Sequence, residues 1–124
     1  MEITDLDGTY LVTTATDHQS PIAKKSDGLT EIRSGWTERT DEAGCLWTTQ
    51  LAILSENEVE FISTADPSAA NGDFCLTDKN GNLTRQPVTY QSILRMDRKG
   101  EKIRLSGKIE HGHITTVITL MKQV

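Results

Sequence analysis

The sequence predicts an all-β domain in which eight antiparallel strands form an up-and-down β-barrel. Threonine occurs 17 times and isoleucine ten times in the 124 residues, and such stiff β-branched side chains suit a pleated surface. Turn dipeptides such as Asp27-Gly28 and Asn80-Gly81 recur between the candidate strands. Within the strands, apolar and polar residues alternate, so each strand buries one face. A two-sheet β-sandwich is the alternative, because eight such strands can also split into packed sheets.

The predicted strands span residues 8–14, 29–40, 44–54, 58–65, 73–78, 87–97, 101–110 and 113–122. Most of the connections are short, so consecutive strands are expected to pair antiparallel as a meander. The exception is the polar stretch 15–28, which is too long for a tight turn.

Alternation sets the expected orientation of each side chain. In the strand predicted at 29–40, Ile32 and Trp36 share the inward face and Thr37 takes the outward face. Gly35 and Gly107 fall inside strands, where glycine permits the bulges and sharp coiling of a small barrel. A closed barrel leaves no exposed edge strand, and the meander order favours it over the sandwich.

Composition and charge exclude several classes of protein. The length fits one domain, residues 1–124, and 35% of the residues are hydrophobic. A net charge of −5 and a pI near 5.1 argue against nucleic-acid and anionic-membrane partners, which need a basic face. No apolar run approaches the roughly 18 residues of a membrane span, and Met1-Glu2-Ile3-Thr4-Asp5 lacks the order of a signal peptide. We expect a soluble, acidic, cytoplasmic domain.

No metal site and no cofactor is predicted. Cys45 and Cys75 match no zinc spacing, and we expect them to be reduced, buried thiols. His111-Gly112-His113 is expected to form a hairpin turn with both rings exposed. The stretch 78–82 alternates oxygen ligands like a calcium loop, but Thr89 stands where the bidentate acid is needed, so a hairpin turn is expected there as well.

The inward face of the predicted barrel mixes large apolar side chains with polar ones. It comprises Trp36, Trp47, Phe61, Val88, Leu94, Met96, Leu105 and Leu120 together with Ser34, Glu38, Ser63, Tyr90 and Ser92. A small core seldom admits so many polar groups unless water or a ligand satisfies them, and an eight-stranded barrel can hold one small molecule. The predicted ligand site consists of Trp36, Glu38, Trp47, Phe61, Tyr90 and Ser92. In the alternative interpretation, Glu38 lies in solvent at the barrel mouth and the serines bond locally.

The opening segment Leu6-Asp7-Gly8-Thr9-Tyr10-Leu11-Val12 resembles the first strand of the calycins, the superfamily of lipocalins and fatty-acid-binding proteins. Gly8 and Tyr10 match the glycine and the aromatic residue that closes one barrel end in that superfamily. The resemblance implies a cup-shaped barrel that holds a small apolar ligand. Residues 15–28 lack the helix pair of the fatty-acid-binding proteins, and the C-terminal segment lacks their Arg-x-Tyr, so no carboxylate site is carried over.

The sequence is compatible with three functions. The first is binding of a small apolar or amphipathic molecule inside the barrel. The second is a structural or interaction role, with a homodimer formed through an outer apolar face of Ile62, Ile93, Val117 and Met121. The third is a barrel isomerase, cyclase or hydrolase, for which Glu38 is the inward acid or base; no catalytic residue is assigned beyond this candidate.

Overall fold

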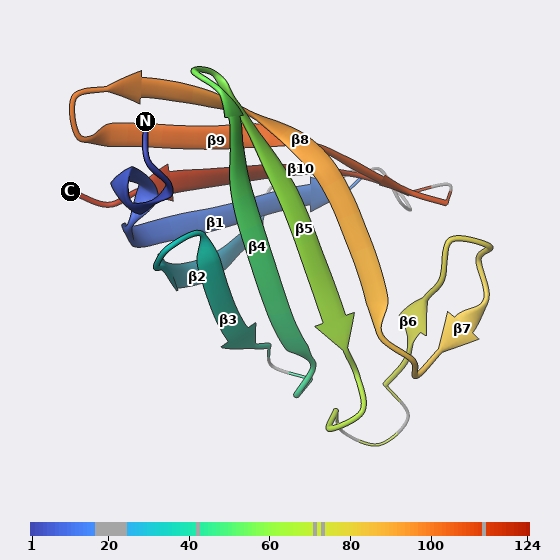
Figure 1. Cartoon of the computed structure of the whole chain (residues 1–124). Helices are drawn as coiled ribbons and strands as arrows, with labels where there is room; N and C mark the ends of the chain where they lie inside the picture. The colour runs from blue at the N-terminus through green and yellow to red at the C-terminus, as the bar shows by residue number, and fades with distance from the viewer. Residues whose placement is uncertain (17–24, 42, 71, 73, 113) are drawn as a thin grey trace.

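The computed structural model describes residues 1–16, 25–41, 43–70, 72, 74–112 and 114–124. Eight strands form one antiparallel sheet that is nearly closed into a barrel, in the order β2-β1-β10-β9-β8-β5-β4-β3 (Figure 1). These strands are β1 (Gly8–Thr16), β2 (Lys25–Ile32), β3 (Trp36–Thr40), β4 (Leu46–Ser55), β5 (Glu58–Asp66), β8 (Val88–Lys99), β9 (Lys102–His111) and β10 (Ile114–Lys122). The all-β meander predicted from the alternation is confirmed.

Figure 1 shows how the sheet wraps around its interior. Strands β4 and β5 cross steeply in front of β1, β9 and β10, β3 lies beside β4, and the long strand β8 bends from one group into the other. The 3-10 helix η1 (Ile3–Leu6) precedes β1 at one end of the barrel. A small hairpin of β6 (Leu76–Thr77) and β7 (Leu83–Thr84) lies outside the barrel sheet.

The strand predicted at 29–40 is wrong, because the chain reverses direction in its middle. Ser34 and Gly35 have φ angles of 50° and 77°, and positive φ at both central residues is typical of a two-residue hairpin turn. Arg33 and Trp36 exchange two backbone hydrogen bonds of 2.9 Å across this turn. Gly35 is therefore a turn residue, whereas Gly107 lies inside β9 as predicted, where an added Cβ would approach Leu94 Cδ2 to 2.8 Å.

The strand predicted at 73–78 is also largely wrong, since among its described residues, 74–78, only Leu76 and Thr77 form a strand, and they pair with β7 instead of a barrel strand. The turn that follows explains why the strand stops. The carboxylate of Asp78 accepts hydrogen bonds of 2.9 Å from the backbone N–H groups of Asn80 and Asn82. This stretch forms the hairpin turn that was predicted. The connection predicted at 15–28 is shorter at both ends, and 17–24 lies outside the described residues.

The hydrophobic core fills the barrel end beside η1. Leu6 and Tyr10 are fully buried there, and the Tyr10 hydroxyl donates a 2.7 Å hydrogen bond to the Leu6 carbonyl. Burial, with the negative charge of Asp7, raises the pKa of Tyr10 to about 12. The core cluster also contains Val12, Ile32, Leu51, Val59, Phe61, Leu94, Met96, Ile103, Leu105, Ile109, Ile118 and Leu120. One end of the barrel is thus closed by packed side chains.

The barrel is not fully closed between β2 and β3, which are the two edges of the described sheet. The hairpin at 33–36 joins these strands at one end. Further along, the hydroxyls of Thr30 and Thr37 form a hydrogen bond across the gap between them. No helix in the described part of the chain is long and apolar enough to cross a membrane.

Candidate functional site

A cavity of about 630 Å³ lies inside the barrel and is lined by residues from all eight barrel strands. This volume is within the range of small-molecule pockets in proteins. The packed end of the barrel forms its floor, and the side chains that line it change in character from the floor to the mouth. Three levels can be distinguished from the strand register.

The floor of the cavity is apolar. Phe61 on β5 is almost fully buried, and Val12 and Leu120 are direct partners on β1 and β10. All three belong to the core cluster, and Ile118 lies beside them. An apolar part of a ligand would be desolvated at this level.

Above the floor lies a level of hydroxyl groups, which we call the hydroxyl belt: Thr30, Thr37, Thr49, Ser63 and Tyr90. The last four are consecutive cross-strand partners on β3, β4, β5 and β8, so their side chains lie side by side along the cavity wall. The Thr49 and Ser63 hydroxyls are 2.8 Å apart and hydrogen-bonded. Together with the Thr30–Thr37 bond, two hydroxyl pairs face the cavity.

The rim of the cavity contains Arg39, Asp41 and Trp47. The Asp41 carboxylate accepts three hydrogen bonds of 3.0 Å, from the Trp47 indole Nε1–H and from the backbone N–H groups of Ala43 and Cys45. Burial alone would raise the pKa of Asp41, but these hydrogen bonds and the charge of Arg39 outweigh burial and lower the pKa. Asp41 is therefore an ionised anchor for Trp47 and a poor proton acceptor.

An aromatic stack connects the rim with the small hairpin. The rings of Trp47 and Tyr90 are stacked, with centroids 5.7 Å apart and planes inclined by 23°. Tyr90 also contacts the His111 ring at a centroid distance of 4.6 Å, and His111 Nε2 is 2.9 Å from the Thr77 carbonyl oxygen. Burial and the nearby Cys45 raise the pKa of Tyr90. The stack fixes one wall of the cavity.

The structure brings three of the six predicted ligand-site residues together. Trp47, Phe61 and Tyr90 line the cavity. Ser92 does not, and its hydroxyl donates a 2.6 Å hydrogen bond to the Lys108 carbonyl on the neighbouring strand, which agrees with the alternative of local bonding for this serine.

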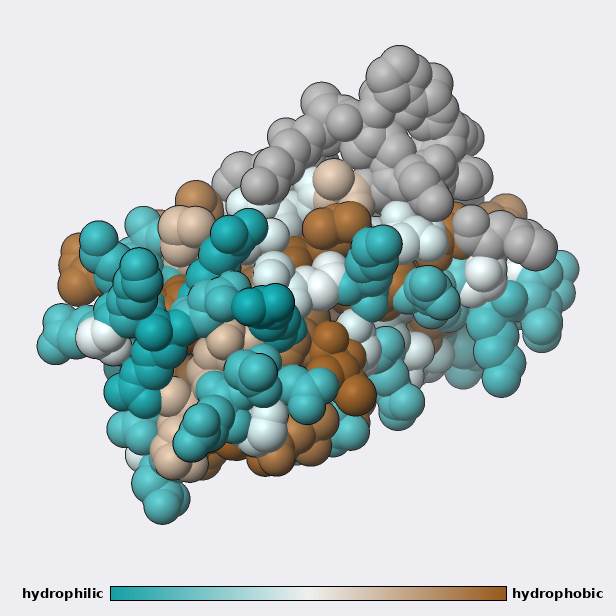
Figure 2. Space-filling model, turned by 90° about the horizontal axis from the view of Figure 1, so that it is seen from above, coloured by the Kyte–Doolittle hydropathy of each residue, from teal (hydrophilic) through white to brown (hydrophobic). Residues whose placement is uncertain are grey.

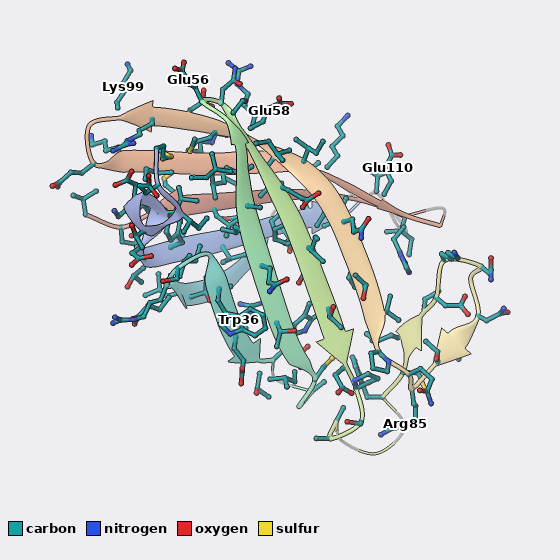
Figure 3. All side chains as sticks on the ribbon, in the orientation of Figure 1. Trp36, Glu56, Glu58, Arg85, Lys99 and Glu110 are labelled. Carbon is teal, nitrogen blue, oxygen red and sulfur yellow. The ribbon has the colours of Figure 1, made fainter. Side chains whose placement is uncertain are left out.

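The prediction that Trp36 and Glu38 point inward is wrong. Trp36 lies at the start of β3 (Figure 3), with its side chain 44% exposed, and Glu38 is exposed on the same face. In a two-residue hairpin, Arg33 and Trp36 lie opposite each other and share a face. Thr37 and Arg39 consequently point inward and Ser34 is exposed in the turn. The inward carboxylate expected for an enzyme is thus absent at position 38.

The threonines of the hydroxyl belt and the rim residues Arg39 and Asp41 were not predicted from the sequence. The dipeptide Ser34-Gly35 did contain a signal. If it is interpreted as a turn, a new strand begins at Trp36 and the alternation of inward and outward side chains starts again there. Thr37 and Arg39 then fall on the inward face. For Asp41 the signal is weaker, because its hydrogen bonds to the connection that follows depend on the local chain path.

The other residues considered for metal binding or reactivity, His111, Cys45 and Cys75, do not form one site in the described part of the chain. Within the described ranges, no three His, Cys, Asp or Glu residues are grouped as metal ligands. His111 is half-buried, so the prediction that it is exposed is wrong, while the hairpin turn after it is confirmed; His113 lies outside the described residues. Cys45 and Cys75 are free thiols, of which Cys45 is buried and Cys75 only half-buried. Burial, with the charges of Asp41 and Asp66, raises the pKa of Cys45.

The outer faces of the strands carry polar side chains with smaller apolar areas between them, as on the face shown in Figure 2. Ile93, Val117 and Met121 are exposed, as predicted, and Ile62 is half-buried. These apolar side chains thus lie on the outside of the barrel, whereas the cavity lies inside it.

Comparisons of the chain with models of protein families, with curated proteins and with solved structures find no match.

Proposed function

We propose that the protein binds one small amphipathic molecule in the barrel cavity. The observation that supports this function is the 630 Å³ cavity with an apolar floor and a level of converging hydroxyls. Ligand sites commonly combine apolar walls with a few polar groups that orient the ligand. A barrel of eight strands is wide enough to enclose one such molecule.

We also infer that the barrel is calycin-like. Support comes from Gly8 and Tyr10, which match the calycin pattern, and from the burial of Tyr10 beside η1 at the closed barrel end. The meander of eight antiparallel strands is compatible with that superfamily. In this proposal, η1 and Tyr10 close the cup and the cavity opens at its other end.

The enzyme alternative receives less support from the cavity. Glu38 is exposed outside it, and the carboxylate of Asp41 is engaged by three donors. A general base needs an accessible carboxylate with a pKa near the working pH, whereas the pKa of Asp41 is lowered.

The two tryptophans allow a direct test, because Trp47 lines the cavity and Trp36 lies outside it. In the Trp36→Phe variant, Trp47 is the single fluorescent indole, and titration with 8-anilinonaphthalene-1-sulfonate should change its emission to saturation at one probe per chain. In the matched Trp47→Phe variant, Trp36 should lose intensity by energy transfer to the probe, but its emission maximum should not shift, because Trp36 lies outside the cavity. Absence of a saturable change of Trp47 emission, together with no uptake of the probe in equilibrium dialysis, would exclude the proposed function.

A second proposal concerns the outer face of β2, β1 and β10, through which we infer that two copies associate. Leu11 is the direct partner of both Leu29 and Met121, and Leu29, Met121 and the nearby Val117 are exposed. These four side chains are uncharged, while Glu31 on the same face of β2 lies toward its edge beside Thr9, so two copies can meet at the apolar centre without burying a charge. Sedimentation velocity should show a dimer that Met121→Glu dissociates, and a wild-type monomer at high micromolar concentration would reject the proposal.

A further inference from the structure

We propose that the ligand is a neutral ring compound with a hydroxyl or carbonyl group that hydrogen-bonds to the hydroxyl belt, while its apolar end contacts the floor. This inference rests on the proposed function and specifies the chemistry of the ligand. Its support is the position, the pairing and the electrostatic surroundings of the belt.

Buried polar side chains are concentrated around the cavity. Among the described residues, five polar side chains are buried: Thr30, Thr37, Thr49, Ser63 and Thr119. The first four line the cavity, and all four belong to the hydroxyl belt. Buried hydroxyls cost free energy unless hydrogen bonds compensate for lost hydration. Their concentration around one cavity therefore favours a role in binding the molecule that occupies the cavity.

The belt has hydrogen-bonding capacity to spare. Each hydroxyl has one proton and two lone pairs. In the Thr49–Ser63 pair, and likewise in the Thr30–Thr37 pair, the bond between the two hydroxyls uses one of two protons. No buried side-chain N or O atom of the described residues lacks a partner. The belt is therefore stable without a ligand, and each pair retains a rotatable proton and lone pairs with which to bind a hydroxyl or carbonyl oxygen.

The charges at the cavity lie on the rim and not in the belt. Arg39 and Asp41 line the rim together, and their opposite charges act on one another, since Arg39 lowers the pKa of Asp41. The belt below them contains only neutral hydroxyls. An anionic group at belt level would lose hydration without a cation there to compensate it. A neutral oxygen avoids this cost.

The separation of floor and belt fits the size of a ring. Phe61 lies two residues from Ser63 on β5, and both side chains point inward. Two residues of a strand span roughly 7 Å, which leaves room for about one ring between floor and belt. A ring compound whose oxygen points toward the hydroxyl belt therefore places its apolar part against Phe61, Val12 and Leu120.

Two naphthalenes test the belt, because 2-naphthol and 2-methylnaphthalene share a ring system and differ in a hydroxyl against a methyl group. The readout is the ratio of the dissociation constant of 2-methylnaphthalene to that of 2-naphthol. In the double variant Thr49→Val with Ser63→Ala, which removes both hydroxyls of one pair, this ratio should fall about tenfold from its wild-type value, since a buried hydrogen bond contributes roughly that factor. The ratio cancels general changes in cavity size.

The matched control removes a neighbouring pair of hydroxyls on the same two strands. Thr48 and Thr64 are direct partners on β4 and β5, one residue away from the belt and absent from the cavity wall. The double variant Thr48→Val with Thr64→Val should keep the wild-type ratio. Thr30→Val with Thr37→Val removes the second belt pair and provides an independent variant if the first does not fold.

A third probe, 2-naphthoate, tests neutrality and should bind more weakly than 2-naphthol. If both naphthalenes bind and the ratio stays unchanged in the belt variants, or if 2-naphthoate binds more tightly than 2-naphthol, the inference is wrong while the proposed function stands. If no naphthalene binds and 8-anilinonaphthalene-1-sulfonate does not bind either, the proposed function fails and the inference fails with it.

Discussion

The indole Nε1–H of Trp47 donates a 3.0 Å hydrogen bond to the carboxylate of Asp41, six residues earlier in the chain. The same carboxylate binds two backbone N–H groups of the connection from β3 to β4. One ionised side chain thus holds both the connection and the ring at the rim. The shape of the cavity mouth depends on this arrangement.

Replacement of Asp41 by alanine should destabilise the protein by about 1–2 kcal/mol, because three donors lose their acceptor at a partly exposed position. Asp41→Asn should cost less, since an amide oxygen can still accept one or two of the bonds. Urea denaturation monitored by circular dichroism measures both. Equal stability of Asp41→Ala and the wild type would contradict the anchoring role.

The contribution of Asp41 should also depend on pH. Its folded pKa lies below the ordinary value of 3.8, so the unfolded chain binds the proton more readily than the folded protein. The stability difference between wild type and Asp41→Asn is therefore expected to be fully present above about pH 4 and to shrink as the pH falls through the folded pKa. A difference that is constant between pH 7 and pH 2 would reject this assignment.

Tyr10→Phe tests the closed end of the barrel. The variant loses the hydrogen bond to the Leu6 carbonyl but keeps the ring, and we expect a loss of about 1 kcal/mol at pH 7. Because the folded pKa of about 12 exceeds the ordinary 10.0, the unfolded chain releases the proton first and wild-type stability falls between these pH values. The Phe variant should lack this contribution, so the difference between the two proteins should narrow above pH 10.

Gly35→Ala tests the hairpin that sets the inward face of β3. An alanine Cβ would lie 2.7 Å from the Leu51 carbonyl oxygen, at a φ of 77°. Strain and the clash with the backbone should together cost about 2–4 kcal/mol. Gly100→Ala is the control, since its φ is 61° but no atom lies within 4 Å of the added Cβ; it should cost about 1 kcal/mol. Equal costs of the two substitutions would show that the close approach at Gly35 is unimportant.

Filling the cavity should abolish binding without unfolding the barrel. Thr116 lines the cavity and the next residue, Val117, is exposed on the outer face. Thr116→Phe should therefore prevent binding of 8-anilinonaphthalene-1-sulfonate, whereas Val117→Phe should bind it like the wild type. Loss of binding in both variants, or in neither, would place the probe outside the cavity.

Much of the fold could be predicted because its signal is local. In β9, Ile103, Leu105 and Ile109 are buried and alternate with polar residues. The same alternation identified most of the other strands, and the short connections between them predicted which strands pair. The hairpin at 33–36 was missed because Ile32 and Trp36 are four residues apart, which is also the spacing of one face of a continuous strand. The two-residue turn shifts the alternation, so that Thr37 and not Trp36 shares the inward face with Ile32, and the spacing of Ile32 and Trp36 does not reveal this shift.

The site was predicted only in part, because it depends on which strands lie side by side. Trp47, Phe61 and Tyr90 were identified from alternation within their own strands. The hydroxyl belt could not be found in this way, since Thr37, Thr49 and Ser63 become neighbours on the cavity wall only through the pairing of β3, β4 and β5. The inward orientation of Thr37 further depends on the turn that was missed.

Binding of a small molecule inside the barrel is tested most directly by methyl chemical shifts, measured by NMR during titration with 2-naphthol. Ile118 lines the cavity, while its neighbour Val117 is exposed on the outside. Saturable shifts are expected for the methyl groups of Ile118, Val12 and Leu120, with none for Val117, Leu29 or Ile93. Shifts confined to the outer set, or no saturable shift at all, would contradict binding in the cavity.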